Sequence, residues 1–133
     1  MDNCIFCKIV KGDVPSYKIY EDELTYAFLD IHPATKYHAL VIPKNHCKNI
    51  FDVSEQDLNA VMATVKKIVD LYNRKIGINN VQIINSSCAE AQQDVFHLHF
   101  HVVPRQTCDG QNINWTKHPE LVEKLPDLLN KII

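Results

Sequence analysis

Three histidines occupy every second position of one short segment, a spacing that can place them together in a reactive site. Residues 97–103 read His-Leu-His-Phe-His-Val-Val. Because side chains alternate between the two faces of a β-strand, His97, His99 and His101 would share one face, about 7 Å apart, while the residues between them enter the core. Three kinds of site fit this pattern: a metal site with three histidine ligands, a histidine-lined core face, and a nucleophilic histidine with positioned partners.

A second candidate site begins at a Cys-x-x-Cys pair, Cys4 and Cys7. Such a pair offers two thiolates to one tetrahedral zinc ion from a short turn. The sequence holds no second Cys-x-x-Cys, so a structural zinc site needs two further ligands. The predicted set is Cys4, Cys7, His46 and His97. The alternatives are a redox pair or two unrelated buried thiols for the cysteines, and a surface-loop histidine for His46.

Composition limits the classes of protein that the chain can belong to. Its 133 residues fit one domain, 1–133, and 46% hydrophobic with 23% charged residues is typical of a globular protein. A net charge of −2 does not favour binding to nucleic-acid polymers. No stretch reaches the length of a transmembrane helix and no signal sequence is evident, so we expect no membrane partner and a cytoplasmic location. Five cysteines without a secretion signal argue against a disulfide framework.

The flanking sequence predicts the elements that must position these residues. Ser54 and Asp57 resemble a helix cap, and apolar residues then recur at helical spacing until Gly77. The other predictions are a short helix or turn at 4–10, strands at 17–20, 24–30, 38–42, 81–85 and 95–103, and a C-terminal helix at 119–132 interrupted by Pro126. These elements fit an α+β fold in which an antiparallel sheet carries helices on one face.

The sequence resembles the histidine triad (HIT) superfamily, in its zinc-carrying branch close to the Hint nucleoside phosphoramidases and bacterial HIT proteins. The likeness runs from Cys4-Ile5-Phe6-Cys7-Lys8-Ile9 through residues 27–33 and 38–46 to Asn85, the histidines and Pro104-Arg105. It implies a five-stranded antiparallel sheet with one long helix and a C-terminal helix. It also implies that the sheet continues across a homodimer.

The resemblance implies a nucleotide hydrolase acting on purine nucleoside 5'-phosphoramidates. In it, His99 attacks the α-phosphorus, and water hydrolyses the resulting nucleotidyl-histidine to the nucleoside monophosphate. His101 contacts a phosphate oxygen and the leaving group, and the backbone of His97 orients His99 while its side chain serves zinc. His38 supports the triad; its alternative is a strand-end histidine that points to solvent.

The resemblance also implies a purine nucleotide site. Asp30 would accept hydrogen bonds from the two ribose hydroxyls. The remaining positions are Phe6, Phe28, Ile31 and Leu40 around the base, and Asn85, Gln93, Asp94 and Val95 near the phosphate. For the apolar residues the alternative is ordinary core, and for the amides it is satisfaction of loop backbone.

Residues 92–95 depart from the family pattern, because Gln-Gln-Asp-Val stands where Gly-Gln-Ser/Thr-Val is usual. An ionised carboxylate repels phosphate, so Asp94 would either turn away or meet a cationic leaving group. The hypothesis is a preference for amine-bearing conjugates such as nucleotidyl-lysine. Gln92 means that the loop either avoids a glycine-only conformation or accepts strain of about 1–2 kcal/mol. Arg105 and Trp115 are candidate lid or leaving-group contacts, or else a surface arginine and a core tryptophan.

Several functions remain open at the level of sequence. Hydrolysis of dinucleoside polyphosphates and nucleotidyl transfer share the covalent intermediate. A different class of enzyme would use the three histidines as ligands of a catalytic metal. A non-catalytic, zinc-stabilised nucleotide-binding regulatory dimer is the alternative that is not an enzyme.

Overall fold

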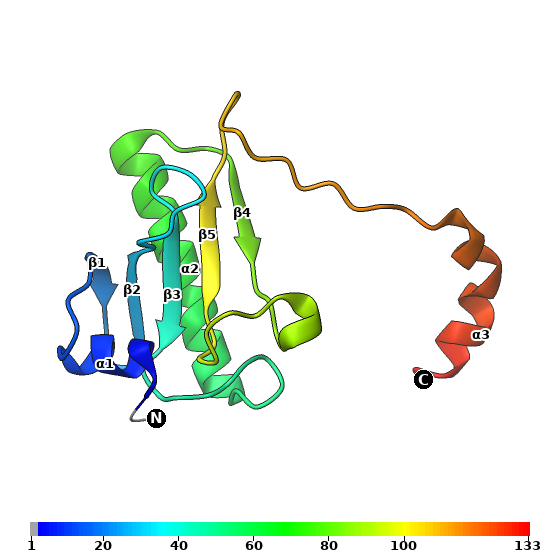
Figure 1. Cartoon of the computed structure of the whole chain (residues 1–133), viewed down its shortest axis with the longest axis horizontal. Coiled ribbons are helices and arrows are strands. Elements are labelled where there is room, and N and C mark those ends of the chain that lie inside the picture. Colours follow the sequence, from blue (N-terminus) through cyan, green and yellow to red (C-terminus); the bar gives the residue numbers. More distant parts are fainter. Residues whose placement is uncertain (1–2) are drawn as a thin grey trace.

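The computed structural model describes residues 3–133 and has a five-stranded antiparallel sheet at its centre (Figure 1). The strand order is β1-β2-β3-β5-β4. The elements are α1 (Ile5–Lys11), β1 (Lys18–Glu21), β2 (Thr25–Leu29), β3 (Ala39–Pro43), α2 (Glu55–Ile76), β4 (Val81–Ile84), η1 (Ala89–Ala91), β5 (Phe100–Pro104), η2 (Pro119–Lys124) and α3 (Leu125–Asn130). The predicted α+β fold is confirmed. Among the described residues, no helix is both long and apolar enough to cross a membrane.

The long helix α2 covers one face of the sheet (Figure 1). Its cap is the predicted one, because Ser54 Oγ accepts a hydrogen bond from the Asp57 N–H at 3.1 Å. It ends at Gly77, whose φ of +70° is the left-handed conformation that glycine adopts without strain. Every second residue of a strand, for example Ala39 and Val41 of β3, packs against the apolar face of α2.

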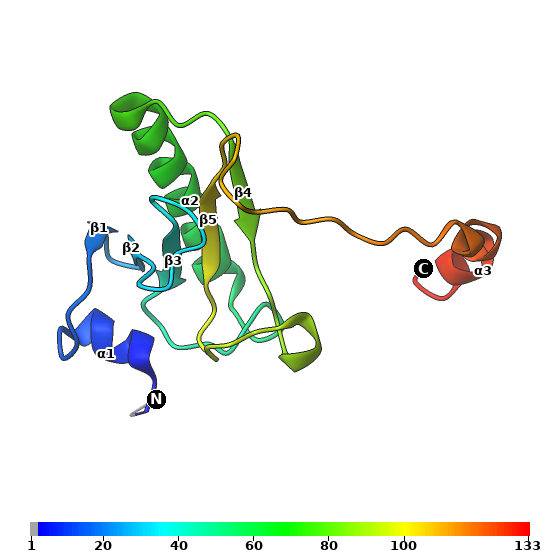
Figure 2. The same ribbon diagram turned by 45° about the horizontal axis from the view of Figure 1, so that its top comes forward.

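The opposite face of the sheet is partly covered by α1, which lies at the lower left in Figure 2, below β1 and β2. Phe28 and Leu40 of the sheet pack there against Phe6 and Ile9 of α1. The expectation that the helices share one face is therefore wrong, because α1 has its own small core on the other side. This second face is the one that carries the histidines.

The predicted strand over residues 95–103 is shorter in the structure. In the register that pairs Val41 with Phe100, Leu98 would lie opposite Pro43, which has no N–H to donate. The ladder therefore stops, and β5 begins at Phe100, so that only His101 of the triad lies in the strand. The predicted alternation survives, because Leu98 is fully buried against the α2 side.

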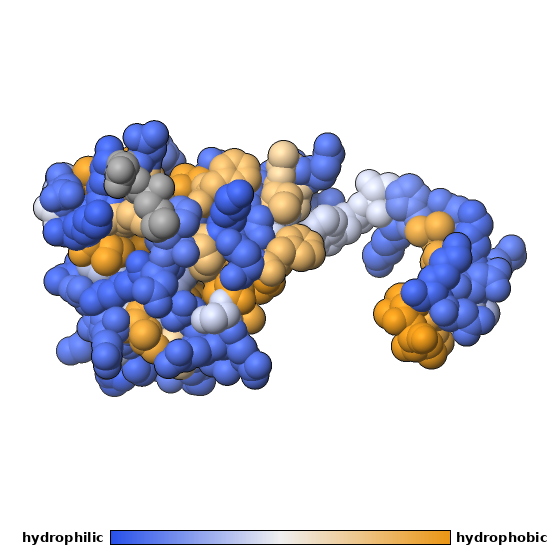
Figure 3. All heavy atoms as spheres, turned by 90° about the horizontal axis from the view of Figure 1, so that it is seen from below, coloured by the Kyte–Doolittle hydropathy of each residue, from blue (hydrophilic) through white to orange (hydrophobic). Residues whose placement is uncertain are grey.

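The C-terminal residues form an arm that projects from the body of the molecule (Figures 1 and 2). Instead of one interrupted helix, η2 is followed by α3, with Pro126 in the first turn of α3 where its missing N–H is tolerated. Exposed apolar side chains gather on this segment (Figure 3), among them Leu121, Leu125 and Leu129. Trp115 is 85% exposed, so the core alternative for this residue is wrong.

Candidate functional site

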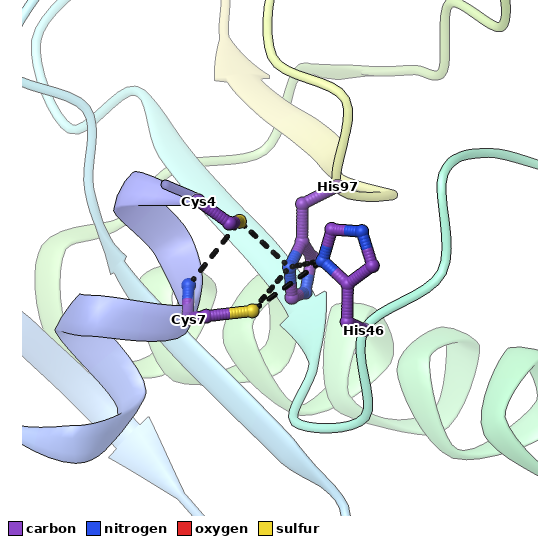
Figure 4. Close-up of side chains that lie close together, drawn as sticks. All are labelled: Cys4, Cys7, His46 and His97. Atoms are coloured by element: carbon purple, nitrogen blue, oxygen red, sulfur yellow. Dashed lines mark hydrogen bonds between the residues drawn. The ribbon is translucent and has the colours of Figure 1, made fainter. Parts of the chain in front are cut away.

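A cluster of two thiols and two imidazoles joins α1 to the histidine segment (Figure 4). Cys4 is the N-cap of α1, and its Sγ accepts a hydrogen bond from the Cys7 N–H at 3.4 Å. His97 Nδ1 lies 3.4 Å from Cys4 Sγ and 3.5 Å from Cys7 Sγ. His46 Nδ1 lies 3.4 Å from Cys7 Sγ and 3.2 Å from His97 Nδ1. The structure thus brings together all four predicted metal ligands.

The spacing of these four atoms fits a tetrahedral zinc ion. With Zn–S near 2.3 Å and Zn–N near 2.05 Å, tetrahedral ligands lie about 3.5 Å apart for a sulfur and a nitrogen and about 3.3 Å apart for two nitrogens. The three sulfur–nitrogen distances above and the single nitrogen–nitrogen distance agree with these values. The donor set is also the one that zinc prefers in structural sites.

The hydrogen bond made by His97 Nε2 determines the protonation state of His97 Nδ1. Its Nε2–H donates to the Pro43 carbonyl at 2.8 Å, which leaves Nδ1 without a proton and free to bind a metal. Because both ring nitrogens are engaged in this way, His97 does not converge with His99 and His101. The idea that the three histidines form one catalytic metal site is therefore wrong.

His99 is held with one ring nitrogen available. Its Nδ1–H donates to the backbone carbonyl of His97 at 2.8 Å, so Nε2 carries the lone pair. Asn85 Nδ2 donates to the carbonyl of His99 at 3.0 Å and fixes the backbone from the other side. The ring of Phe6 meets the ring of His99 edge to face, with centroids 5.3 Å apart. The geometry gives a buried imidazole with an oriented, unprotonated nitrogen.

His101 is paired with His38 rather than with His99. The Nδ1 of His38 accepts the N–H of Ala34 at 2.9 Å, so the His38 proton lies on Nε2, which donates to His101 Nδ1 at 2.9 Å. His101 therefore carries its own proton on Nε2. Burial lowers the pKa of His101 to about 4 and lowers the pKa of His38 as well, so both rings are neutral at neutral pH. The solvent-facing alternative for His38 is wrong, since only 6% of the residue is exposed.

A cavity of about 250 Å³ lies under α1 and ends at His99 and His101. Most of its lining residues are apolar, and Asp30 also lines it, with Oδ2 at 3.5 Å from His38 Nε2. The predicted nucleotide residues that line it are Phe6, Phe28, Asp30, Ile31, Leu40, Asp94 and Val95. Phe6, Phe28 and Leu40 are buried, whereas Ile31 is 70% exposed at the mouth.

Two predicted phosphate contacts lie outside this cavity lining. Asn85 uses its amide N–H on the His99 carbonyl, as described above. Gln93 is buried and holds the loop together: Oε1 accepts from the Cys88 N–H at 2.8 Å, and Nε2 donates to the carbonyls of Lys48 and Val95 at 2.7 and 3.0 Å. For both residues the structure supports the alternative, in which the amide satisfies the backbone of a loop.

Asp94 does not turn away from the site. One carboxylate oxygen, Oδ1, lies 3.3 Å from His99 Nε2 and also accepts the Val95 N–H at 2.8 Å. Partial burial opposes ionisation, whereas the hydrogen bond from the Val95 N–H favours the carboxylate, and the pKa of Asp94 is lowered. An anionic group thus stands at the mouth of the cavity, and the side chain is 76% exposed there.

Gln92, two residues before Asp94, has a strained backbone conformation. Gln92 has a φ of +70°, in the left-handed region that favours glycine. Of the two possibilities that its sequence left open, the structure shows the one in which the loop keeps a glycine-like conformation.

Sequence reasoning missed the surface on the far side of His101. Gln82 and Ile84 of β4 lie there beside Arg105 and Ile113, around a further cavity of about 160 Å³. The alternation of side chains along β4 indicates that Gln82 and Ile84 share a face. Only the fold shows the register that pairs Ile84 with His101. A larger cavity of about 530 Å³, near Thr35 and the end of α2, contains no histidine in its lining.

The comparisons with known proteins agree with this architecture. The adenosine 5'-monophosphoramidase of Schizosaccharomyces pombe is 38% identical over 131 residues, which are 98% of this chain and 96% of that protein. A crystal structure of a protein from Streptococcus mutans has 41% identity and a TM-score of 0.92, over 99% of this chain and 84% of that one. A zinc-bound histidine triad family protein from Mycobacterium smegmatis has 32% identity and a TM-score of 0.77, over 99% of both chains.

The family model described as the HIT domain matches residues 11–108, which include β1 to β5 and the three histidines. With relatives of this identity over nearly the whole chain, the conclusion follows directly: this chain belongs to the HIT family.

Proposed function

We propose that the chain, as a single HIT domain, hydrolyses purine nucleoside 5'-phosphoramidates through a covalent nucleotidyl-His99 intermediate. The observation that carries this proposal is the pair of opposed ring nitrogens at the end of the cavity. His99 offers a bare Nε2, because its Nδ1–H is held by the His97 carbonyl, and His101 offers an Nε2–H, because its Nδ1 accepts from His38. The name of the S. pombe relative supports the same substrate class.

The nucleotide is placed by the apolar end of the cavity. A purine fits between aromatic and aliphatic walls by stacking and van der Waals contact, here from Phe6, Phe28 and Leu40. Asp30 lines the same cavity, and in this proposal its carboxylate accepts hydrogen bonds from the ribose hydroxyls. The α-phosphate then lies at His99.

The first chemical step exchanges one phosphorus–nitrogen bond for another. His99 Nε2 attacks the α-phosphorus, and the bond from phosphorus to the amide nitrogen of the leaving group breaks. The leaving nitrogen takes the proton from His101 Nε2 and departs as an amine. His101 is then an imidazolate without a proton on either ring nitrogen, and its Nδ1 still accepts from His38. Its negative charge balances the positive imidazolium that forms when His99 Nε2 bonds to phosphorus while Nδ1 keeps its proton.

The second step reverses the roles. Water gives a proton to His101 Nε2 while its oxygen attacks the phosphorus, and the bond from phosphorus to His99 Nε2 breaks. The products are the nucleoside monophosphate and the enzyme with its original protons. The low pKa of His101, about 4, keeps this ring neutral in the resting enzyme.

Zinc, in this proposal, is structural and is held by Cys4, Cys7, His46 and His97. When bound, the ion ties α1 to the residue whose carbonyl orients His99. The chain's own contribution is the hydrogen bond from His97 Nε2 to Pro43, which fixes the ring for coordination. The zinc-bound relative from M. smegmatis supports the choice of metal.

We further propose that the chain forms a homodimer. β4 is an edge strand of the sheet, and pairing with a second copy at this edge would extend the sheet. Ile83 on β4 is 39% exposed and would be covered in such a pair. Sedimentation equilibrium should give twice the chain mass, and a monomer mass at micromolar concentration would contradict the proposal.

Phosphoramidates are favoured over dinucleoside polyphosphates and over nucleotidyl transfer to a phosphate. These alternatives place more negative charge near the α-phosphorus, where the Asp94 carboxylate already stands 3.3 Å from His99 Nε2. Like charges at such distances are repelled, while an amine leaving group adds no negative charge. The same carboxylate supports the narrower proposal of a preference for lysine-type conjugates.

The test compares wild type with His99→Ala on adenosine 5'-phosphoramidate. We expect wild type to release the monophosphate and to show a mass increase of one adenylyl group after rapid quenching, and the variant to do neither. Turnover by the variant at the wild-type rate would rule out His99 as the nucleophile. If wild type binds AMP but shows no turnover, the non-catalytic nucleotide-binding dimer becomes the better account.

A further inference from the structure

The loop between β2 and β3 determines which ring nitrogen of His38 carries the proton. The Ala34 N–H donates to His38 Nδ1 at 2.9 Å, so the proton of His38 lies on Nε2 and is donated to His101 Nδ1 at 2.9 Å. The opposite arrangement is also consistent with two neutral imidazoles. If His38 carried its proton on Nδ1, its Nε2 would accept from His101 Nδ1–H, and His101 Nε2 would have no proton to give. The Ala34 N–H thus selects the arrangement that serves the proposed reaction.

Asp30 favours the same arrangement without fixing it. Its Oδ2 lies 3.5 Å from His38 Nε2, at the outer limit of a hydrogen bond, and that nitrogen already donates to His101. Its Oδ1 accepts the His32 N–H at 2.8 Å. The direct contact that sets the His38 proton is therefore the backbone N–H of the loop.

The residue before His38 has a strained backbone. Tyr37 has a φ of +68°, in the left-handed region where a bulky side chain is an outlier. Such a conformation persists only where the surrounding structure holds it, and outliers of this kind cluster at functional sites. The loop is therefore held by groups outside itself.

Two side-chain hydroxyls hold the loop to neighbouring elements. The O–H of Tyr72 on α2 donates to the Tyr37 carbonyl at 2.8 Å, and the two rings pack with centroids 5.9 Å apart. The C-terminal end of α2 and this loop both lie at the top of Figure 1. The Oγ1–H of Thr35 donates to the carbonyl of Pro104, at the end of β5, at 2.7 Å. One hydroxyl thus joins the loop to α2 and the other joins it to the strand of His101.

Other contacts of the loop are weaker supports. The cavity of about 530 Å³ is lined by residues 35–37 and by residues 76–80, so close packing does not hold this side of the loop. Gln111 Nε2 donates to the Ala34 carbonyl at 3.0 Å, but this hydrogen bond is exposed. Tyr72, in contrast, is buried, and burial raises its pKa to about 12, so its hydroxyl remains a donor at neutral pH.

We propose that Tyr72 and Thr35 are positioning residues that hold this loop in place and thereby keep the proton of His101 on Nε2. Neither of them lines the cavity under α1, so they act through the loop and not on the substrate. The inference rests on the proposed function, because it concerns the proton that leaves with the amine. It gives α2, which packs on the face of the sheet opposite the histidines, a part in the proton transfer.

The experiment compares two AMP derivatives that differ in their need for this proton. The ethylamine phosphoramidate must receive a proton on its departing nitrogen, whereas the p-nitrophenyl ester releases a stable phenolate that needs none. The readout is the ratio of kcat/KM for the phosphoramidate to kcat/KM for the ester, because a variant that only misplaces the nucleotide lowers both alike. We expect Tyr72→Phe and Thr35→Val each to lower this ratio about fivefold, as is usual for the loss of one hydrogen bond.

Two control variants accompany them. Thr35→Ser keeps the hydroxyl and should keep the wild-type ratio. Tyr20→Phe also removes a phenol hydroxyl, one that donates to Asp22 and accepts from Lys67 away from the loop, and it should leave the ratio unchanged.

Histidine nitrogen NMR provides a second readout that does not depend on turnover. In wild type, His101 should show a protonated Nε2 and an unprotonated Nδ1; its signals are identified by their absence from His101→Gln. In Tyr72→Phe and Thr35→Val both signals should move toward intermediate shifts, because the two proton arrangements become mixed. A general loss of stability would not produce this change in the folded chain.

The outcomes separate this inference from the proposed function. An unchanged ratio, or unchanged nitrogen shifts, in both Tyr72→Phe and Thr35→Val would overturn the positioning role while the proposed hydrolase stands. An equal fall in kcat/KM for both substrates would overturn it as well. If wild type cleaves only the phosphoramidate, the nitrogen shifts decide. If wild type hydrolyses neither substrate, the proposed function fails and the inference falls with it. Because the two residues lie on different elements, either variant decides the question if the other does not fold.

Discussion

The Oδ1 atom of Asp94 lies 3.3 Å from the Nε2 atom of His99, the nitrogen that the proposed mechanism uses for attack. A carboxylate at this position opposes an approaching anion and attracts a cation. The proposed preference for amine-bearing conjugates therefore depends on the charge of one exposed side chain, which can be changed without altering the buried imidazoles.

Replacing Asp94 should lower the preference for cationic leaving groups. We expect Asp94→Asn, which keeps the shape and removes the charge, and Asp94→Ser to lower the ratio of kcat/KM for a lysyl phosphoramidate of AMP to that for a neutral alkylamine conjugate. A pair of opposite charges near a protein surface is worth on the order of 1 kcal/mol, so the change should be about fivefold. An unchanged ratio in both variants would remove Asp94 as a determinant of specificity.

Substituting a ligand of the proposed zinc site should release the metal and destabilise the chain. Wild type is expected to contain one zinc per chain by elemental analysis, and Cys7→Ser to contain little. Because zinc binding energy becomes folding energy, Cys7→Ser or removal of zinc by a chelator should lower the unfolding free energy by several kcal/mol. Cys108→Ser is the control, since Cys108 is exposed and lies outside the cluster. A wild-type protein without metal, equally stable with and without chelator, would contradict a structural zinc site.

The loop residue Gln92 offers a test of backbone strain. Its φ of +70° costs a non-glycine residue about 1–2 kcal/mol, and glycine returns part of this through the entropy of its unfolded chain. We therefore expect Gln92→Gly to raise the unfolding free energy by up to about 1 kcal/mol in urea denaturation. Ala91→Gly, next to it in η1, should lower it instead, because its backbone gains nothing from glycine. If both variants are destabilised alike, the strain at Gln92 is not relieved by glycine.

Much of the site follows from sequence because the decisive spacings are local. Cys4 and Cys7 lie on one turn, and the alternation from residue 97 to residue 102 sends Leu98 into the core as expected. What the sequence could not supply is register. Only the pairing of β3 with β5 shows that Leu98 would face Pro43, which ends the strand at Phe100 and frees the His97 segment to reach the thiols.

The roles of polar loop side chains also could not be predicted from sequence, because their hydrogen-bond partners depend on the assembled fold. From sequence, Gln93 and Asn85 are amides near a phosphate site, and nothing local distinguishes binding a ligand from satisfying backbone. In the folded chain Gln93 contacts the carbonyl of Lys48, which is 45 residues away in sequence. Long-range hydrogen bonds of this kind decide the role of an amide, and they appear only when the loops are assembled.

The paired histidines should make stability depend on pH in a defined window. Burial lowers the pKa of His101 to about 4 in the folded chain, whereas an unfolded histidine titrates near 6.5. Between these values the unfolded state binds more protons, so the unfolding free energy rises with pH from about 4 to about 6.5 and is fully present above it. Each such group contributes a slope of up to about 1.4 kcal/mol per pH unit.

Urea denaturation at several pH values between 4 and 7 measures this slope. His101→Gln, which removes the titrating ring but keeps a polar side chain of similar reach, should show a smaller slope than wild type over the same window. His118→Gln is the matched control, because His118 is exposed on the arm, at the start of η2, and its loss should leave the slope nearly unchanged. Equal slopes in wild type and His101→Gln would show that His101 is not held neutral by burial, and the proton assignment at its Nε2 would then have to be revised.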